Sequence, residues 1–477
     1  REKAFIGGQW VGAASGRTLD VFEPASGEIL GSVPDCDDGD TRAAIDAAAT
    51  AFKAWRALTG YQRAVLMERW HRLIMQNVAD LARILTAEQG KPLKEAASEV
   101  EAAAGFVKWY AEEARRLEGY AVAGPQNDRR ILVMKEPVGV TAAITPWNFP
   151  AAMVARKCAP ALAAGCTMVM KPSELTPYTM LALADLAAQA GIPAGVLNVV
   201  TGRPERIGAE LTSSPIVRKL SFTGSTRIGA LLMQQCAPTI KRLSLELGGN
   251  APFIIFDDAD LDIVLDAVMT SKFRNAGQTC VSANRILVQD GIFDAFTARL
   301  TALVKTQKLG TGFAADTTVG PLIHAQAVTK VRGLVDEAVA RGSTVIARTS
   351  TDQSPDRFMA PAILAGVTSD MRIAREEIFG PVASLMRFQR EDEAVALANG
   401  TPYGLASYFF TENIHRAWRV AEQLEAGMVG LNTGKVSLEM APFGGIKRSG
   451  LGREGGRAGL EEYQELKTFH MGGLKTA

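Results

Sequence analysis

Short β-type runs alternate with helical segments from Pro137 onward, and this alternation limits the possible folds of the chain most strongly. The runs VGVTAAIT, CTMVMK and VLNVV are separated by stretches with helical patterning at 151–163 and 178–190. Strands that alternate with helices are typical of parallel sheets, because parallel strands need long crossover connections. A second series begins near Ala251 with APFIIF and RILVQ and continues to about residue 430. The expected fold class is therefore α/β, with two α/β lobes.

Two segments depart from this alternation. Residues 40–117 carry apolar side chains at three- and four-residue spacing, which predicts long helices. The segment RRILVMKE at 129–136 alternates like a strand although its neighbours read as helix and loop. It is interpreted as an arm that pairs outside its own lobe. Because 477 residues exceed what one hydrophobic core supports, a cleft between packed domains is the expected ligand site.

Charge and composition exclude several classes of protein. The 52 basic and 51 acidic residues leave a formal charge of +1, too balanced for the field of a nucleic-acid binder. The longest strongly apolar stretch, at 159–170, is too short to span a bilayer and contains Gly165, so no membrane association is expected. No signal pattern follows Arg1. Five irregularly spaced cysteines indicate neither disulfides nor a zinc site, so a reducing cytoplasm is expected.

Cys280 differs from the other four cysteines. Cys158 and Cys166 stand among alanines and Cys236 on an amphipathic segment, where a thiol usually packs as a small hydrophobe. Cys36 lies among aspartates, whose charge disfavours its thiolate. Cys280 stands in FRNAGQTCVSANR, where glycine and small polar residues leave room for a substrate. It is a candidate nucleophile, with a buried structural thiol as the alternative.

Two further motifs suggest acid–base and oxyanion chemistry. LELGGN places Glu246 between leucines, where an apolar setting raises the pKa of a carboxyl toward that of a general base. A salt-bridged carboxylate at a strand end is the alternative. TPWNFP places Asn148 on a turn between two prolines, where its amide and a backbone N–H at the cysteine would form an oxyanion hole. A plain turn residue is the alternative there.

A phosphate site is suggested by KLSFTGSTRIGALLMQQ at 219–235, which reads as strand, tight turn and helix. Ser225 or Thr226 would begin the helix, whose free N–H groups attract phosphate. Most such turns bind nothing, and the usual glycine fingerprint of dinucleotide folds is absent. In MVMKPSE, Lys171 and Glu174 are candidates for ribose hydroxyls, with ordinary surface charge as the alternative.

Taken together, the motifs resemble the aldehyde dehydrogenase superfamily along nearly the whole chain. They are, in order, PWNFP, KPSE, FTGSTRIG, LELGGN, GQTC, EEIFGP and PFGGIKRSGLGRE. SKFRNAGQTCVSANR, ARKCAP and SGLGREGG most resemble the succinate-semialdehyde dehydrogenase branch. The resemblance implies a homo-oligomer, a dimer or a homotetramer. It implies three parts: a Rossmann-like NAD-binding domain (1–118 and 138–248), a catalytic domain (249–445), and a β oligomerisation arm with the C-terminal segment (119–137 and 446–477).

The resemblance also assigns roles to single residues. Cys280 would be the nucleophile that carries a thioester, Glu246 the base for its hydrolysis, and Asn148 with the Cys280 N–H the oxyanion hole. The residues implied at the cofactor are Trp147, Lys171, Ser173, Glu174, Gly224, Ser225, Glu377 and Phe379. Without the resemblance, Glu377 would be read as a surface helix charge and Phe379 as core. No metal is implied, and the four histidines are scattered along the chain.

Cofactor choice is expected to depend on Glu174, which can accept both ribose hydroxyls but repels a 2′-phosphate. NAD is therefore favoured, while NADP stays possible because Lys171 would soften the repulsion. An acylating dehydrogenase that uses coenzyme A is the rival enzyme class, and Glu246 argues against it, because those relatives generally lack this base. A non-catalytic descendant is the other rival, and it would be expected to lose Cys280 or Asn148.

The resemblance further predicts a small anionic aldehyde as substrate. It places Arg156 and Arg274 at the mouth of the aldehyde tunnel and Ser437 on the loop that closes it; internal ion pairs of the two arginines are the alternative. Succinate semialdehyde is the first choice, with glutarate semialdehyde close behind. Lys435 adds a third cation that would suit a sulfonate such as sulfolactaldehyde, unless it points to solvent. Ser282 replaces the second cysteine common in this branch, so a local thiol-disulfide switch is not expected.

Overall fold

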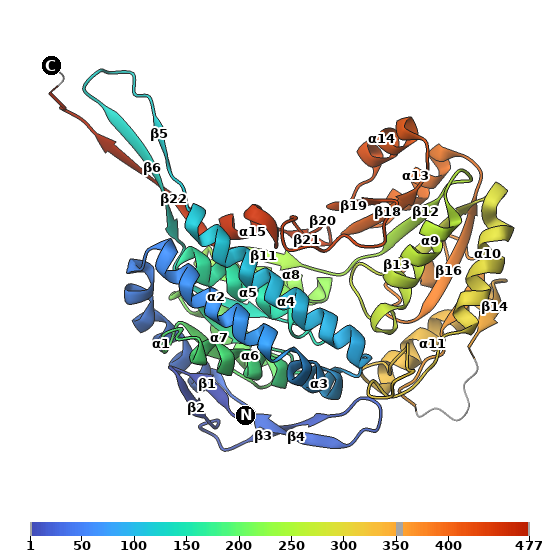
Figure 1. Ribbon diagram of the computed structural model, residues 1–477, viewed down its shortest axis with the longest axis horizontal. Coiled ribbons are helices and arrows are strands. Elements are labelled where there is room, and N and C mark those ends of the chain that lie inside the picture. The colour runs from blue at the N-terminus through green and yellow to red at the C-terminus, as the bar shows by residue number, and fades with distance from the viewer. Residues whose placement is uncertain (1, 350–355, 476–477) are drawn as a thin grey trace.

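The first lobe is built on an eight-stranded sheet. The structure, a computed structural model, describes residues 2–349 and 356–475 (Figure 1). The strand order is β2-β1-β9-β8-β7-β10-β11-β21. The central strands are parallel, and in chain order they run 3-2-1-4-5, the order of dinucleotide-binding sheets. Their bounds are β1 Ala4–Ile6, β2 Gln9–Val11, β7 Val140–Ile144, β8 Thr167–Lys171, β9 Leu197–Val199, β10 Val217–Thr223, β11 Arg242–Glu246 and β21 Gly450–Leu451.

Helices cover both faces of this sheet, as the apolar spacing predicts. Trp55, Trp70 and Tyr110 are among the largest fully buried side chains and anchor the long helices of residues 38–113 to the core. Two further strands, β3 Thr18–Phe22 and β4 Ile29–Pro34, form a separate hairpin. The helices are α1 Asp38–Ala57, α2 Gly60–Gln76, α3 Val78–Gln89, α4 Leu93–Glu113, α5 Ala152–Ala164, α6 Tyr178–Gln189, α7 Pro204–Ser213 and α8 Thr226–Cys236.

The second lobe has a seven-stranded sheet in the order β14-β15-β16-β13-β12-β18-β19, parallel except for β14. Its strands are β12 Ala251–Ile255, β13 Ala283–Gln289, β14 Thr344–Arg348, β15 Ala362–Ala365, β16 Val382–Phe388, β18 Ala406–Phe410 and β19 Met428–Leu431. Its helices are α9 Leu261–Val268, α10 Asp290–Lys305, α11 Ala325–Ala340, α12 Arg372–Arg375, α13 Glu391–Asn399 and α14 Ile414–Gln423. The predicted α/β class with two lobes is confirmed.

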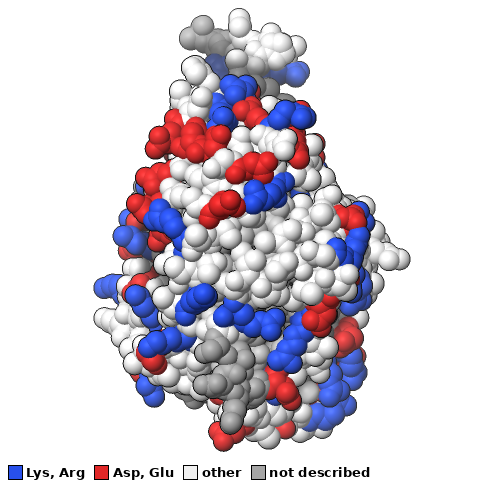
Figure 2. Space-filling view, turned by 90° about the vertical axis from the view of Figure 1, so that its right-hand side faces the viewer, with Lys and Arg blue, Asp and Glu red and all other residues white. Residues whose placement is uncertain are grey.

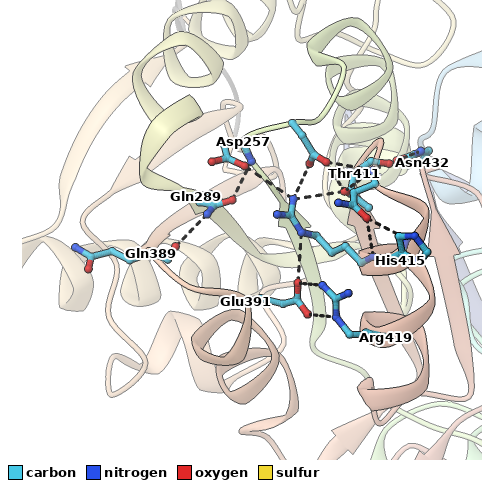
Figure 3. Close-up of polar contacts among 11 residues, drawn as sticks. Asp257, Gln289, Gln389, Glu391, Thr411, His415, Arg419 and Asn432 are labelled. Carbon is cyan, nitrogen blue, oxygen red and sulfur yellow. Dashed lines mark hydrogen bonds and ion pairs between the residues drawn. The ribbon is translucent and has the colours of Figure 1, made fainter.

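The carboxyl ends of the second sheet are closed by the protein's own polar side chains (Figure 3). Arg416 of α14 bonds to Asp258 at 2.8 Å and pairs with Glu391 at 3.4 Å. Arg419 bonds to the same Glu391 at 3.0 and 2.9 Å. Gln289, at the end of β13, accepts a hydrogen bond from the backbone N–H of Asp257 at 3.0 Å. These contacts fix α13 and α14 and fill the edge of the sheet where α/β proteins often bind ligands.

A three-stranded arm protrudes from the first lobe (Figure 1). It contains β5 Tyr120–Val122, β6 Arg130–Pro137 and β22 Gln464–Met471, in the order β22-β6-β5. The C-terminal segment that we predicted with this arm is divided between several parts of the molecule. β20 Ile446–Lys447 pairs with β17 Tyr403–Gly404, and β21 joins the first sheet through β11. α15 Gly456–Glu461 packs on α5, so only β22 extends the arm.

The surface matches the balanced composition. Figure 2 shows basic and acidic side chains interspersed on the face that it presents. Among the described residues, no helix is both long and apolar enough to cross a membrane.

Candidate active site

The candidate site lies between the lobes, at the carboxyl ends of the first sheet and the amino ends of the second. β7 and β10 are neighbours in the sheet although β8 and β9 lie between them in the chain, which makes a switch point where α/β sheets bind ligands. A cavity of about 340 Å³ opens there. Its lining includes Trp147, Asn148, Gly224, Ser225, Glu246, Cys280, His324, Lys330, Glu377 and Phe379. The three predicted catalytic residues therefore share one cavity.

Cys280 is the one cysteine of the five that is not fully buried. It lies on the turn before β13. Burial raises the pKa of its thiol well above the ordinary value, and the nearby Glu246 carboxylate raises it further, while Arg156 lowers it. The thiol is therefore protonated at neutral pH.

Glu246 ends β11 and is 3% exposed. Neither carboxylate oxygen accepts a hydrogen bond of good geometry from the described residues. Burial raises the pKa of Glu246, and Arg156 opposes that rise. The Cys280 thiol also interacts with this carboxylate. A buried carboxylate with a raised pKa is suited to take a proton from a water.

Asn148 is held by bonds to both its side chain and its backbone. Its amide donates to the carbonyl of Gln278 at 3.0 Å, which leaves the second amide hydrogen for a ligand. Its backbone carbonyl accepts from Lys91 Nζ at 2.8 Å and from the Asn275 amide at 2.9 Å. The rigid donor is what an oxyanion hole requires.

The turn that carries Cys280 has an unusual backbone. A π-helical turn, Met269–Phe273, follows α9, and Asn275 and Ala276 then adopt left-handed conformations at φ 51° and 52°. Such conformations cost energy outside glycine and are retained where the surroundings enforce them. The turn is anchored to the first lobe: the Asn275 N–H donates to Glu95 at 2.8 Å, and Gln89 donates to the Asn275 side chain at 2.9 Å.

The sequence analysis did not identify these anchors. Gln89 and Glu95 lie 186 and 180 residues from Asn275. Lys91, between them, forms a fully buried ion pair with Glu99. Glu99 in turn accepts from the backbone N–H of Ala151 at 2.9 Å and so caps the start of α5. The sequence contained one signal of these anchors: four polar residues within the stretch 89–99, which was interpreted only from the spacing of its apolar residues.

On the cofactor side, Ser225 is the N-cap of α8, with its hydroxyl accepting from the Ile228 N–H at 3.4 Å. Trp147 and Phe379 meet edge to face with their ring centroids 5.6 Å apart. Phe379 has a positive φ of 54°, and Glu377 accepts from the Gly249 N–H at 3.3 Å. The free helix start, an aromatic slot and an acceptor carboxylate fit a dinucleotide that lies across the switch point.

Three further residues that were expected at the cofactor, Lys171, Ser173 and Glu174, lie outside this cavity. Lys171 ends β8 and pairs with Glu174 at 2.6 Å. Ser173 is 6% exposed, and its hydroxyl accepts from the Leu175 N–H at 3.2 Å. The three residues share the carboxyl edge of the sheet with the catalytic cavity, next to β7.

Arg156 is not at an open tunnel mouth as predicted. It is 3% exposed, donates a hydrogen bond to Glu454 through Nε at 2.9 Å, and has Nη2 in an ion pair with the same carboxylate at 2.8 Å. Its guanidinium lies 4.0 Å over the Phe443 ring. This arrangement is the internal ion pair given as the alternative. The guanidinium pairs inward because burial leaves a cation stable only beside an acid.

Arg274 is half-buried and differs from Arg156. It lies 5.0 Å from the Phe149 ring, and residues 2–349 and 356–475 provide no hydrogen-bond or ion-pair partner for it. Lys435 and Ser437 are exposed on the loop after β19 and do not line the cavity. Within the described ranges, no group of three metal-ligating side chains lies close enough to hold an ion.

Comparison with known proteins places the chain in a family. The model of the aldehyde dehydrogenase family matches residues 10–469. The chain is 54% identical to a glutarate-semialdehyde dehydrogenase of Pseudomonas aeruginosa, and 53% identical both to a succinate-semialdehyde dehydrogenase (NADP(+)) of Escherichia coli and to a 3-sulfolactaldehyde dehydrogenase of Pseudomonas putida. Each alignment covers 99% of this chain and 98% of the relative.

A crystal structure of an aldehyde dehydrogenase from Brucella melitensis biovar abortus 2308 superposes with a TM-score of 0.98 at 55% identity. It covers 100% of this chain and 98% of the other. The chain therefore belongs to the aldehyde dehydrogenase family, whose members are NAD(P)-dependent oxidoreductases.

Proposed function

We propose that the protein oxidises succinate semialdehyde to succinate through a thioester on Cys280. The convergence of Cys280, Glu246 and Asn148 in one cavity carries the proposal. The choice of substrate is supported by the Escherichia coli relative and by Arg274, a half-buried cation. Within the described residues its guanidinium forms no ion pair, although the Glu95 carboxylate acts on it electrostatically. Such a group is free to bind a carboxylate with a directed hydrogen bond.

The residues of the chain divide the chemistry as follows. The bound nicotinamide supplies the acceptor for the hydride. The Cys280 thiol loses its proton to solvent, and the resulting thiolate adds to the aldehyde carbon. Asn148 and the Cys280 N–H bind the oxyanion, which collapses to a thioester when the hydride has left. Glu246 then takes a proton from a water that attacks the acyl carbon, and the thiolate departs.

Cofactor choice follows from the Lys171–Glu174 pair. Glu174 accepts ribose hydroxyls and repels a 2′-phosphate, which favours NAD. Lys171 already neutralises part of this charge at 2.6 Å, so we expect NADP to be used as well, with lower efficiency. Lys171→Met should increase the preference for NAD, measured as the ratio of kcat/KM for the two cofactors.

Two alternative substrates have specific support. Glutarate semialdehyde is one carbon longer, and the Pseudomonas aeruginosa relative carries its name. Sulfolactaldehyde is supported by the name of the Pseudomonas putida relative, and Lys435, on the exposed loop after β19, is the cation that would bind its sulfonate. We also propose a cytoplasmic homotetramer, or a dimer, that assembles through the arm.

The test is a panel of aldehydes with the purified protein. Succinate semialdehyde, glutarate semialdehyde, sulfolactaldehyde and butanal are compared by kcat/KM, each with NAD and NADP. We expect the anionic aldehydes to exceed butanal by at least about tenfold, since one charge-assisted hydrogen bond contributes about 1.5–3 kcal/mol. Equal values for butanal and the anions would exclude an anionic substrate.

A pair of variants tests which side chain binds the anionic group of the substrate. Arg274→Met should reduce kcat/KM for the anionic aldehydes and leave butanal unchanged, while Arg72→Met, at an exposed position of α2, should change neither. Lys435→Ile should reduce turnover of sulfolactaldehyde more than that of succinate semialdehyde. Equal losses on the two substrates would remove the sulfonate alternative.

A further inference from the structure

Lys272 is a buried cation that the proposed chemistry leaves without a role. It lies on the π-helical turn before the Cys280 loop, and its exposed fraction is 0%. No described residue hydrogen-bonds to its Nζ. A buried ammonium is unfavourable unless an anion compensates it, so its position requires a nearby negative charge. π-helical turns occur frequently at functional sites.

The turn packs against the segment that carries Glu377. A Cβ built on Gly277 would lie 2.3 Å from the Gly380 carbonyl and 3.0 Å from the Lys272 carbonyl, so the three backbones are in close contact. The side chains of Lys272 and Glu377 interact electrostatically. Burial lowers the pKa of Lys272 to about 7, and Glu377 opposes that shift. Among the described residues, Glu377 is the acidic group that acts on this lysine.

Glu377 lines the cavity and needs help to remain ionised there. Burial raises its pKa to about 7; the Gly249 N–H, Lys330 and Lys272 lower it, and Glu246 raises it. Lys330 of α11 is exposed, and its Nζ is bonded to the Glu377 backbone carbonyl at 2.7 Å, so solvent screens its effect on the carboxylate. Of the two lysines, Lys272 is the buried one, so solvent does not screen its effect on the Glu377 carboxylate.

We propose that Lys272 is a positioning residue of the cofactor site, which keeps Glu377 ionised so that its carboxylate can accept hydrogen bonds from the ribose of the nicotinamide cofactor. The inference rests on the proposed function, in which Glu377 contacts that ribose. In a protonated carboxyl, one oxygen carries a hydrogen and donates a hydrogen bond. The group could then no longer accept hydrogen bonds from the ribose hydroxyls through both oxygens. The pair of charges thus extends cofactor binding to lower pH.

The test measures NAD affinity of the full-length protein from pH 6 to 9, by quenching of the intrinsic fluorescence to which Trp147 in the cavity contributes. Affinity of the wild type should fall as the pH drops through about 7, where Glu377 gains its proton. In Lys272→Met the fall should move to higher pH by about one pH unit, which weakens NAD at pH 7 by up to about tenfold. Lys272→Arg should restore the profile, and kcat at saturating NAD should change less than KM.

Two further variants separate this effect from general destabilisation and from failure of the proposed function. Lys241 is a buried lysine remote from the site, bonded to the carbonyls of Ser214 and Val217, and Lys241→Met should lower stability without moving the pH profile. Glu377→Gln should weaken NAD binding and abolish the profile, and Lys272→Met should add nothing to it. If Lys272→Met does not fold, Lys272→Gln carries the same expectation.

The outcomes are distinguishable. An unchanged profile in the Lys272 variants, together with weak binding in Glu377→Gln, would overturn the role of Lys272 and leave the cofactor site intact. Wild-type binding by Glu377→Gln would overturn the role of Glu377 in the proposed function itself. A shifted profile in Lys272→Met but not in Lys241→Met supports the proposal.

Discussion

The proton affinities of Cys280 and Glu246 are set by burial and by each other. Burial raises the pKa of both groups, and the carboxylate disfavours a thiolate beside it. The same carboxylate is the candidate base for hydrolysis of the thioester. Removing its charge therefore has opposite effects on the thiol and on hydrolysis.

Glu246→Gln should make Cys280 more reactive toward an alkylating reagent while it reduces aldehyde turnover. Loss of the negative charge lowers the thiol pKa, so iodoacetamide at pH 8 should modify the cofactor-free variant about three to ten times faster than the wild type. Turnover should fall about a hundredfold or more because hydrolysis loses its base. Peptide mapping should find the four buried cysteines unmodified. Slower alkylation of the variant would show that Glu246 activates the thiol instead.

Glu454 is the acid that compensates two buried cations. It pairs with Arg156 and Lys157, whose exposed side-chain fractions are 3% and 0%. Burial alone would raise the pKa of Glu454, but Lys157 and Arg156 lower it to about 2, from 4.5 for a free glutamate. Because the folded pKa is the lower one, this carboxylate stabilises the fold above pH 4.5. Its contribution is lost as the pH falls from 4.5 toward 2.

Glu454→Gln should lower the free energy of unfolding at pH 7 by about 3 kcal/mol, since two buried cations lose their counter-charge. Urea unfolding should also show that the variant loses less stability than the wild type between about pH 5 and pH 3. Glu461→Gln is the matched control, because Glu461 is 54% exposed in its pair with Lys135. Its effect should stay below about 1 kcal/mol. Equal losses in the two variants would contradict this account.

At the scale of elements, the turn from Arg274 to Gln278 connects the lobes. It carries two left-handed residues before the nucleophile, and α3 and α4 of the first lobe hold it through Gln89 and Glu95. Asn275 also donates to the Asn148 carbonyl at 2.9 Å. One residue thus positions both the nucleophile loop and the candidate oxyanion donor.

Asn275→Ala should reduce both stability and catalysis. Alanine is disfavoured at φ 51° and loses the bonds to Gln89 and Asn148, so the free energy of unfolding should fall by about 2–4 kcal/mol. kcat should fall at least about tenfold, because a displacement of the Asn148 amide by a fraction of an ångström weakens its hydrogen bond to the oxyanion. Asn432 is the matched control: it has the same φ of 51° and bonds to Thr411 in the remote network of Figure 3. Asn432→Ala should destabilise similarly with kcat unchanged; an equal loss of kcat would refute the positioning role.

At the scale of the whole molecule, the arm cannot bury its own apolar side chains. Leu132 and Phe469 pair across β6 and β22 and are 37% and 48% exposed, beside Met134 at 38%. Sheets of three strands are stable when one face is covered, and an apolar strip of this kind marks an interaction surface. We expect a second copy of the chain to cover it.

Phe469→Lys should reduce the molar mass of the assembly, measured by size-exclusion chromatography with light scattering, because a charge would be buried at the contact. Ile414→Lys provides the control, since Ile414 is 72% exposed on α14 of the second lobe, far from the arm (Figure 1), and it should leave the mass unchanged. A wild-type protein that is monomeric at micromolar concentration would remove the expectation.

The sequence by itself determined the architecture and the candidate catalytic residues. Alternating strand and helix patterns predict β7 to β11 with their crossovers, because hydrophobic periodicity is a local property of neighbouring residues. The strand at 129–136 also follows from local alternation, and the family resemblance is confirmed. The catalytic and binding roles assigned from that resemblance stay predictions, although Cys280, Glu246 and Asn148 line the same cavity.

Only the tertiary structure decided the partners of the buried charges. Arg156 was predicted at an open tunnel mouth, but it is buried and pairs with Glu454, 298 residues further along the chain. Its role in substrate binding stays a prediction. Lys272 would be read from the sequence as an ordinary helix lysine, yet it lies fully buried beside Glu377. The physical reason is that burial and charge pairing depend on which side chains packing brings together across hundreds of residues. No pattern within a few positions of Arg156 or Lys272 contains that information.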